Sequence, residues 1–287
     1  RVGLRGYVAY DQLQMLARQN NIQGQTGYSL GLTATADTTG INIHFVPDDP
    51  VIAYKDWTIN PDNFIHLDMA HRHLDANLDM AGAGSRVHLY TEHSDSVATQ
   101  EDVILQITDL QLADWLAMSP FAPPVKGAVS ADMRFGWDQS SLTGTGTVGL
   151  DNLIYGRERV GSFDLGLDLS TTTAGVIHAD ASLLVDSVKV ITARGSLNDS
   201  TSTTPFNLDF SMIHFPLRIV NPFLPPGVAK LHGMLNGEMD ITGTMANPVF
   251  DGFLDFDSTD VLVDMVGTSF KFSDEKIPVD SNIVRFN

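Results

Sequence analysis

The sequence predicts an all-β protein made of antiparallel strands, and three observations lead to this prediction. Apolar and polar residues alternate with a period of two along most of the chain, which places the apolar side chains on one face of a pleated sheet. Short segments rich in Gly, Asp, Asn, Ser and Thr separate these runs and are typical of turns. Only 18% of the 287 residues are charged, whereas helix-rich proteins usually carry more Glu, Lys and Arg.

The alternation is clearest in five runs, which we interpret as strands. Apolar residues occupy every second position in the segments 65–69, 74–80, 129–137, 165–169 and 206–212. In the third run, for example, Val129 and Met133 share one face, whereas Ser130 and Arg134 share the other. Turn residues lie between strands at 37–40, 82–85, 171–175 and 198–202. We expect about 18 strands in all, many joined by the short links of antiparallel hairpins.

Helical periodicity is scarce and is limited to three short segments. Residues 11–20 can form a short helix with Leu13, Leu16 and Ala17 on one side. The segments 114–118 and 217–223 are each long enough for about one helical turn. The sequence therefore predicts helices only as short interruptions of the strands.

The last two helical segments lie at matching places in an internal repeat. A proline pair follows each of them, at 123–124 and at 225–226, and an alternating strand then begins at Gly127 and at Gly233. The spacing of 106 residues between these glycines also relates Gly146 to Gly252. A spacing that is kept at several glycines predicts repeats of about 105 residues and an elongated, modular architecture. We expect an N-terminal β segment at 1–102, a β-repeat at 103–204 and a second β-repeat at 205–287.

Composition excludes several classes of function. The chain has 17 Lys and Arg against 35 Asp and Glu, a formal charge of −18, so phosphate backbones and anionic lipid surfaces would repel it. It has no cysteine, which excludes disulfides, thiolate metal sites and cysteine nucleophiles. No apolar run approaches the roughly 20 residues of a membrane-spanning helix. Because the chain opens at Arg1, we expect it to be a piece of a longer protein whose anchoring segment has been removed.

The segment 231–256 carries the most distinctive motif of the chain. Glycines at 233, 237 and 243 leave room for a strand to bend, and Asn247-Pro248 interrupts a strand because proline cannot donate to the ladder. Two long strands joined by a corner are therefore expected. This motif resembles the TamB family of envelope proteins, within the wider AsmA-like group, in which a strand, a Gly-Thr…Asn-Pro corner and a strand recur. The resemblance is best over 205–287 and extends to 103–170, where residues 137–144 replace the Asn-Pro corner.

The resemblance implies a fold and a function. It implies an elongated, curved antiparallel sheet that forms an open, taco-like trough with a hydrophobic interior. Members of the family are anchored in the inner membrane of diderm bacteria and span the periplasm. They are implicated in carrying phospholipid to the outer membrane and in outer-membrane protein assembly with a β-barrel partner. By this resemblance the chain is a periplasmic carrier of phospholipid acyl chains, without enzymatic activity, cofactor or nucleic-acid partner.

Carriage of acyl chains needs only an apolar wall, and the alternating strands supply one. The predicted wall contains no catalytic or metal-binding residue. Its members are Val129, Met133, Phe135, Leu165, Leu167, Leu169, Phe206, Leu208, Phe210, Leu235, Met239, Ile241, Phe270 and Phe272.

Other interpretations of the same residues remain open. The apolar stripes are equally typical of a sealed sandwich core. The main alternative function is a chaperone that guides outer-membrane strands by pairing along the edge at 282–286. An enzyme or binding protein for envelope polysaccharide would need aromatic platforms, and Trp57, Trp115 and Trp137 are scattered along the sequence. The histidines between 66 and 93 and the aspartates at 75, 79, 164 and 168 show no metal or catalytic spacing, and we interpret them as a polar outer face.

Overall fold

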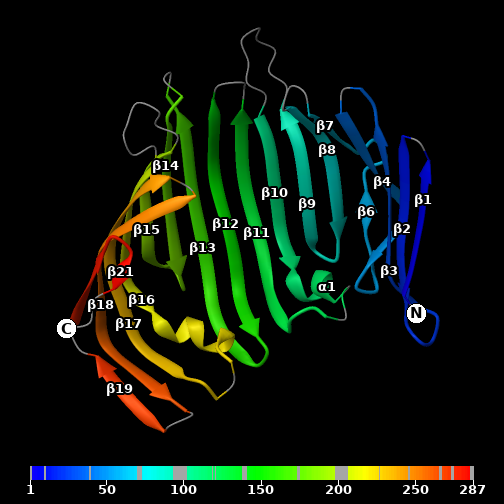
Figure 1. Ribbon diagram of the computed structural model, residues 1–287. Helices are drawn as coiled ribbons and strands as arrows, with labels where there is room; N and C mark the ends of the chain where they lie inside the picture. Colours follow the sequence, from blue (N-terminus) through cyan, green and yellow to red (C-terminus); the bar gives the residue numbers. More distant parts are fainter. Residues whose placement is uncertain are drawn as a thin grey trace. The chain divides into compact units, whose positions relative to one another are not determined.

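The chain folds into one large antiparallel sheet that is not closed (Figure 1). The computed structural model describes residues 2–9, 11–38, 40–69, 73–92, 102–117, 119, 121–137, 141–172, 175–197, 206–225, 227–244, 246–264, 267–272 and 275–284. Strands account for 78% of the structure and helices for 5%, so the predicted all-β class is confirmed. Two compact units divide the chain, an N-terminal unit of residues 1–148 and a C-terminal unit of residues 149–287.

The N-terminal unit contains strands joined mainly by short turns. Its elements are β1 (Val2–Ala9), β2 (Gln12–Asn20), β3 (Thr26–Ala36), β4 (Gly40–Ile52), β5 (Lys55–Asp56), β6 (Thr58–Ile59), β7 (Phe64–Asp68), β8 (His73–Gly82), β9 (Ser85–Glu92), β10 (Asp102–Gln111), α1 (Leu112–Leu116) and β11 (Val125–Trp137). The strands pair in the order β1-β2-β3-β4-β7-β8-β9-β10-β11, every pair antiparallel. The strand β12 (Leu142–Tyr155) contributes residues to both units.

The C-terminal unit continues the antiparallel pattern with longer strands. Its elements are β13 (Glu158–Thr171), β14 (Ile177–Val185), β15 (Val188–Leu197), β16 (Phe206–Pro216), η1 (Leu217–Phe223), β17 (Lys230–Thr244), β18 (Asn247–Val263), β19 (Thr268–Phe272), β20 (Glu275–Asp280) and β21 (Ile283–Val284). The strands from β13 to β18 pair in sequence order. Beyond β18 the sheet divides, because β19 pairs with one part of β18 and β20 pairs with the other.

Two of the three predicted helices are confirmed. The 3-10 helix η1 coincides with the predicted segment 217–223, and α1 overlaps the predicted segment 114–118. In the sequence, each helix follows a strand and precedes a proline pair. No helix in the described ranges has the length and hydrophobicity needed to cross a bilayer. Each helix follows a β-bulge: the register shifts between Ile107 and Leu110 in β10 and between Met212 and Phe215 in β16. A bulge bends the strand and lets the chain leave the ladder into the helix.

The third helical prediction is wrong, since residues 12–20 form the strand β2. The positions 13, 15 and 17 carry Leu, Met and Ala, and this period-two set pairs with Ala34, Leu32 and Leu30 of β3. A period of two and a period of 3.6 share several positions over so short a segment. Hydrogen bonds to both β1 and β3 satisfy the backbone of this segment as a strand, which overrides its weak helical preference.

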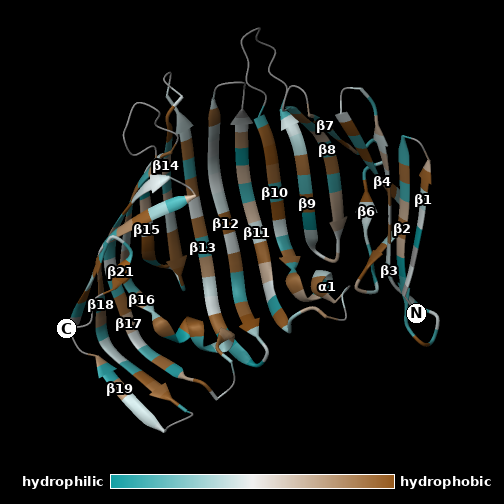
Figure 2. Cartoon of the chain, viewed as in Figure 1, coloured by the Kyte–Doolittle hydropathy of each residue, from teal (hydrophilic) through white to brown (hydrophobic). Residues whose placement is uncertain are grey.

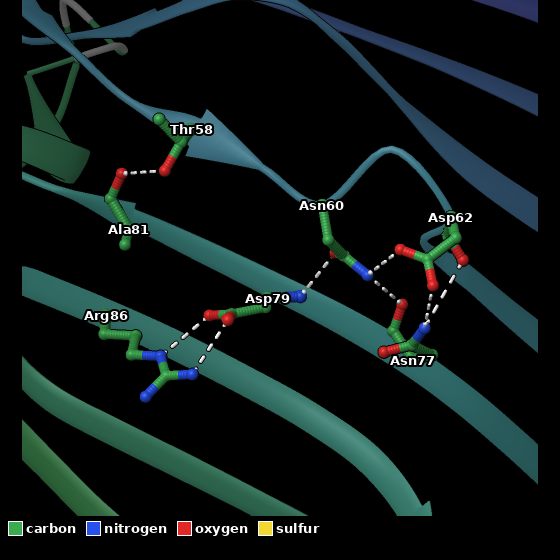
Figure 3. A network of polar contacts seen from close by, with 7 residues as sticks. All are labelled: Thr58, Asn60, Asp62, Asn77, Asp79, Ala81 and Arg86. Atoms are coloured by element: carbon green, nitrogen blue, oxygen red, sulfur yellow. Dashed lines mark hydrogen bonds and ion pairs between the residues drawn. The ribbon is translucent and has the colours of Figure 1, made fainter.

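Two short strands, β6 and β7, take the place of one strand beside β8, and side chains supply hydrogen bonds where the backbone ladder is interrupted between them. Between these two strands, the Asn60 side chain accepts from Asp79 N and donates to Asn77 O (Figure 3). The buried Asn63 side chain accepts from Phe45 N at 2.7 Å and donates to Phe45 O at 2.9 Å. The two amides thereby mimic ladder partners on both sides of the break, which keeps β4 and β8 in register across it.

The Asn247-Pro248 segment begins a strand. Asn247 is paired with Thr244 and Pro248 with Gly243, so the segment opens β18 directly after a tight turn. Proline is tolerated as the second residue of a strand because the ladder has only just started there. The expected outcome, two long strands joined by a corner, is confirmed by the 15 residues of β17 and the 17 residues of β18.

The substitution Gly252→Ala is expected to destabilise the C-terminal unit. Gly252 has φ 154°, and a Cβ at this position would contact the Glu238 carbonyl oxygen and lie 2.9 Å from the Met239 Cα. The backbone of β17 would have to move, so we expect a loss of about 2 kcal/mol in the free energy of unfolding. Urea denaturation followed by circular dichroism measures it.

The matched control is Gly3→Ala in β1. The nearest atom to a Cβ at Gly3 is the Arg18 carbonyl oxygen at 3.8 Å, which is an ordinary contact. We expect the control to unfold at the wild-type urea concentration or slightly above it, because alanine reduces the entropy of the unfolded chain. Identical midpoints for the two variants would contradict the close backbone approach at Gly252.

Candidate functional site

One face of the sheet in the C-terminal unit is apolar from β13 to β18. Directly paired residues in an antiparallel sheet lie on the same face, so each pairing row can be followed from strand to strand. One such row contains Leu167, Ala181, Ala193, Phe210, Met239 and Gly252. The next row contains Leu169, Ala179, Gly195, Leu208, Ile241 and Phe250. We call this surface the C-terminal apolar face; its alternation with polar residues is visible as brown and teal bands in Figure 2.

The N-terminal unit has an apolar face built in the same way. One row contains Met133, Leu105, Leu89 and Leu78. A second row contains Ile65, Ile43, Ala34 and Leu13. We call this surface the N-terminal apolar face. It extends the predicted wall into the segment before residue 103, where the sequence prediction names no wall residue.

The structure places the predicted wall residues on these two faces. Val129, Met133 and Phe135 lie on the N-terminal apolar face, paired with Leu110, Leu105 and Val103. On the C-terminal apolar face lie Leu165, Leu167, Leu169, Phe206, Leu208, Phe210, Leu235, Met239 and Ile241. Phe272 joins them, because its ring centroid lies 5.5 Å from that of Phe256, which is paired with Leu235. Phe270 lies two positions before Phe272 on β19 and is paired with Val261 of β18.

Most of these wall residues are only half-buried. Met133 is buried, whereas Leu165 keeps 43% and Phe270 keeps 50% of its surface exposed. The other eleven predicted wall residues are intermediate between these classes. A sealed sandwich core would bury such leucines and phenylalanines almost completely. Within each described unit the strands pack mainly on their hydrogen-bonded neighbours, so the middle of each apolar face stays accessible.

Short elements cover one part of each face. In the N-terminal unit, Trp57 and Trp115 pack edge to face with ring centroids 5.7 Å apart, over a buried cluster that contains Ile52, Ile59 and Leu78. The tryptophans at 57 and 115 are therefore not scattered in space, which corrects the sequence interpretation for this pair. Their buried indole nitrogens have no hydrogen-bond partner among the residues that the structure describes.

Charged residues hold α1 in place over this cluster. Lys55 Nζ lies 2.8 Å from Asp114 Oδ2 of the helix, and the Tyr28 hydroxyl donates to the Asp114 carbonyl oxygen at 2.5 Å. Burial, and then the nearby Asp114 carboxylate, raise the pKa of the Tyr28 phenol, which keeps it protonated as a donor.

In the C-terminal unit, η1 is held by a charged site on the β14–β15 turn. Arg218 donates to Asp186 Oδ2 at 2.8 Å and to the Val160 carbonyl oxygen at 3.2 Å, and Arg159 donates to Asp186 Oδ1 at 2.9 Å. The Ser162 backbone N–H, then Arg218 and Arg159, hold the pKa of the Asp186 carboxyl below its usual range. Beneath η1, Ile219 is buried against Val160, Val185 and Val190.

The opposite face of the C-terminal unit is polar and acidic. One pairing row contains Asp168, Asp180, Arg194, Asp209, Asp240 and Asp251. Arg194 Nε lies 2.6 Å from Asp180 Oδ2, and a shallow depression of about 400 Å³ lies over the same strands. In the part of the chain that the structure describes, no group of three or more His, Asp or Glu side chains is arranged to hold a metal ion.

The histidines of the N-terminal unit take part in local contacts. His66 Nδ1 lies 2.7 Å from Asn42 Oδ1 on the paired strand, and the His88 ring stacks on Tyr90 at 4.3 Å. The histidines at 71 and 93 lie outside the described residues. Asp79 receives a bidentate interaction from Arg86 at 2.8 Å, and this hydrogen bonding lowers the pKa of Asp79 (Figure 3).

Comparison with protein-family models, with curated proteins and with solved structures finds no match to this chain. The features of the chain that bear on its function are therefore the two apolar faces and the elements that cover part of each.

Several residues of these faces were missed by the sequence prediction. The strands β14 and β15 fill the space between β13 and β16 with Ala179, Ala181, Leu183, Ile191 and Ala193. Their alternation was present in the sequence, and counting period-two matches would have found it. The ion pair between Arg218 and Asp186 joins residues 32 positions apart and carries no sequence signal.

The stability contributed by Asp186 is expected to depend on pH. Because its pKa is lower in the folded protein, the carboxylate stabilises the fold above the unfolded-state pKa, and this stability is lost as the pH falls through the folded-state pKa. At pH 7 we expect Asp186→Asn to lower the free energy of unfolding by about 1 kcal/mol, since its partners are partly exposed to solvent. Urea denaturation of both proteins between pH 7 and pH 3 measures the difference, which should shrink below about pH 4.

Asp164→Asn serves as the control, because Asp164 is exposed and forms no ion pair with any residue that the structure describes. A difference between wild type and Asp186→Asn that stays constant over the whole pH range would contradict the ion-pair network around η1.

Proposed function

We propose that the two apolar faces carry the acyl chains of phospholipid, with the polar head groups kept near solvent. One observation carries this proposal: the paired rows of each face are apolar from strand to strand, and most of their side chains are only partly buried. Large exposed apolar surfaces on a folded protein usually bind a ligand, a partner or lipid. Acyl chains need no specific polar contact, so a wall of Leu, Phe, Met and Ala side chains is sufficient.

The dimensions of the strands suit extended acyl chains. The strand β13 has 14 residues and is therefore roughly 45 Å long at about 3.3 Å per residue. One leaflet of a bilayer has a hydrocarbon thickness of about 15 Å, half of the bilayer core. A single strand length is thus more than enough for an extended chain lying along it.

An internal repeat would extend such a surface in a regular way, and the backbone supports the repeat of about 105 residues. Asp109 and His214 are the positive-φ residues of the bulges in β10 and β16, at φ 47° and 50°, and they are 105 residues apart. The N–H of Asp109 donates to Ser130 Oγ, and that of His214 donates to Asn236 Oδ1 on the next strand. Two bulges that lie one repeat length apart and have the same kind of hydrogen bond favour a duplicated module over a coincidence.

The cellular setting of the proposal comes from the resemblance to the TamB family. It consists of a periplasmic location, a parent chain anchored in the inner membrane, a β-barrel partner in the outer membrane and a sheet curved into an open, taco-like trough. The chain shows no nucleotide-binding motif, so the proposal is passive carriage in which another component sets the direction of transfer.

Phospholipid should co-purify with the protein and should be lost when charges are placed on the C-terminal apolar face. The test variant is Leu167→Asp with Leu208→Asp, because both residues lie on this face in β13 and β16. Buried next to acyl chains, each carboxylate would lose hydration without gaining a partner. We expect bound phospholipid, measured by native mass spectrometry and lipid extraction, to fall at least tenfold.

The matched control places the same charges on the opposite face of the same strands, with Ser170→Asp and Asn207→Asp. Both side chains are exposed, so lipid binding and fold should be retained. A wild-type protein without lipid, or equal lipid loss in both double variants at unchanged circular dichroism, would contradict lipid carriage.

The second candidate function is a chaperone that pairs with strands of outer-membrane proteins. It is favoured by β21, where Ile283 and Val284 are 56% and 46% exposed on a two-residue strand paired with β20. If β21 templates another strand, Ile283→Pro should abolish cross-linking to an unfolded barrel protein, because proline removes an N–H from the ladder. Unchanged cross-linking would contradict this role, and lipid binding should be unaffected in either case.

A further inference from the structure

The C-terminal unit contains a cavity next to η1 that differs from the apolar face in its chemistry. It has a volume of about 520 Å³ and lies between the β12–β13 turn, the segment that links η1 to β17, and the end of β18. Tyr155 lines this cavity and also packs against the buried cluster beneath η1, so the cavity borders the apolar side of the unit. Leu224 adds a further apolar part of the wall.

The rim of this cavity carries two cations and two anions. Arg157 and Lys230 supply the positive charges, and Glu158 and Asp264 supply the negative charges. All four residues are exposed. Among the described residues, none of these four side chains has an ion pair or a side-chain hydrogen bond, although other charged groups of the same unit, such as Asp186 and Arg218, are paired.

Arg157 and Lys230 are distinguished from other described cations without an ion pair, such as Lys126 and Lys189, because both of them line one cavity. With 35 acidic residues against 17 Lys and Arg, an exposed arginine has many carboxylates available to it. Arg157 and Lys230 instead face a cavity together with two carboxylates that are more than 4.0 Å from them, since no ion pair forms. Both signs of charge are thus available to a ligand at one place, at the border of an apolar surface.

We infer that this cavity binds the zwitterionic head group of a phospholipid that has a phosphate and a primary ammonium. The phosphate accepts hydrogen bonds from Arg157 and Lys230, and the ammonium donates to Glu158 and Asp264. The glycerol and the start of the acyl chains contact Tyr155 and Leu224. This inference rests on the proposed lipid carriage and adds a preference for zwitterionic over anionic head groups, in agreement with the overall charge of −18.

The test is isothermal titration calorimetry of the whole chain with four probes below their micelle concentrations. The probes are dihexanoyl phosphatidylethanolamine, dihexanoyl phosphatidylglycerol, dihexanoylglycerol and glycerophosphoethanolamine. They represent a zwitterionic lipid, an anionic lipid, a lipid without a phosphate and a head group without acyl chains. We expect the phosphatidylethanolamine to bind most tightly, because it alone satisfies both charges of the rim and the apolar wall.

Two double variants separate the two charges. Arg157→Gln with Lys230→Gln should weaken phosphatidylethanolamine binding about three- to tenfold and bring it close to that of dihexanoylglycerol. Glu158→Gln with Asp264→Asn should remove the preference over phosphatidylglycerol while both phospholipids still bind. The control, Lys189→Gln with Asp164→Asn, changes exposed charges of the same unit away from the cavity and should leave all four affinities unchanged.

The outcomes distinguish this inference from the proposed function. Wild-type protein that binds none of the three acylated probes overturns lipid carriage and the head-group site together. Equal binding of dihexanoylglycerol and phosphatidylethanolamine supports the apolar face and overturns the head-group site. Equal binding of glycerophosphoethanolamine and phosphatidylethanolamine also overturns the inference, because the cavity would then recognise a soluble phosphate compound and not a lipid.

Discussion

The structure depends on one constraint, which is that residues paired across antiparallel strands lie on the same face of the sheet. Most strands of this chain alternate apolar and polar residues, so a register error of one residue would move apolar side chains to the polar side. The row through Leu167 and Phe210 and the row through Leu169 and Leu208 remain apolar across every strand from β13 to β18. Register therefore determines both the stability of the sheet and the surface proposed to hold lipid.

The same constraint explains the local irregularities of the chain. The bulges at Asp109 and His214 change the direction of a strand just before a helix, and side chains of the neighbouring strand hydrogen-bond the displaced N–H groups. The amides of Asn60 and Asn63 continue the ladder where two short strands replace one. These devices let the chain bring α1 and η1 over part of each apolar face without disturbing the rows beside them.

The covering elements and the exposed parts of the faces have complementary roles. Trp57, Trp115 and Ile219 bury enough apolar surface to give each unit a core, as a single-layer sheet lacks a second layer to supply it. The ion pairs of Asp114 and Asp186 hold those elements in place. The remaining apolar surface can then stay accessible to a ligand, and the cavity beside η1 joins that surface to charged groups.

The sequence by itself determined the all-β class, the faces of the strands and the positions of α1 and η1, because alternation and turn residues act over a few neighbouring positions. It also placed the wall residues from Val129 to Phe272 on apolar stripes. It could not distinguish strand from helix at 12–20, since only pairing with β1 and β3 decides between the two periods there. The contact of Trp57 with Trp115, the anchoring of Arg218 on Asp186 and the four-charge cavity join residues far apart in the chain. Only the tertiary structure decides such contacts, because no local pattern records which distant segments become neighbours.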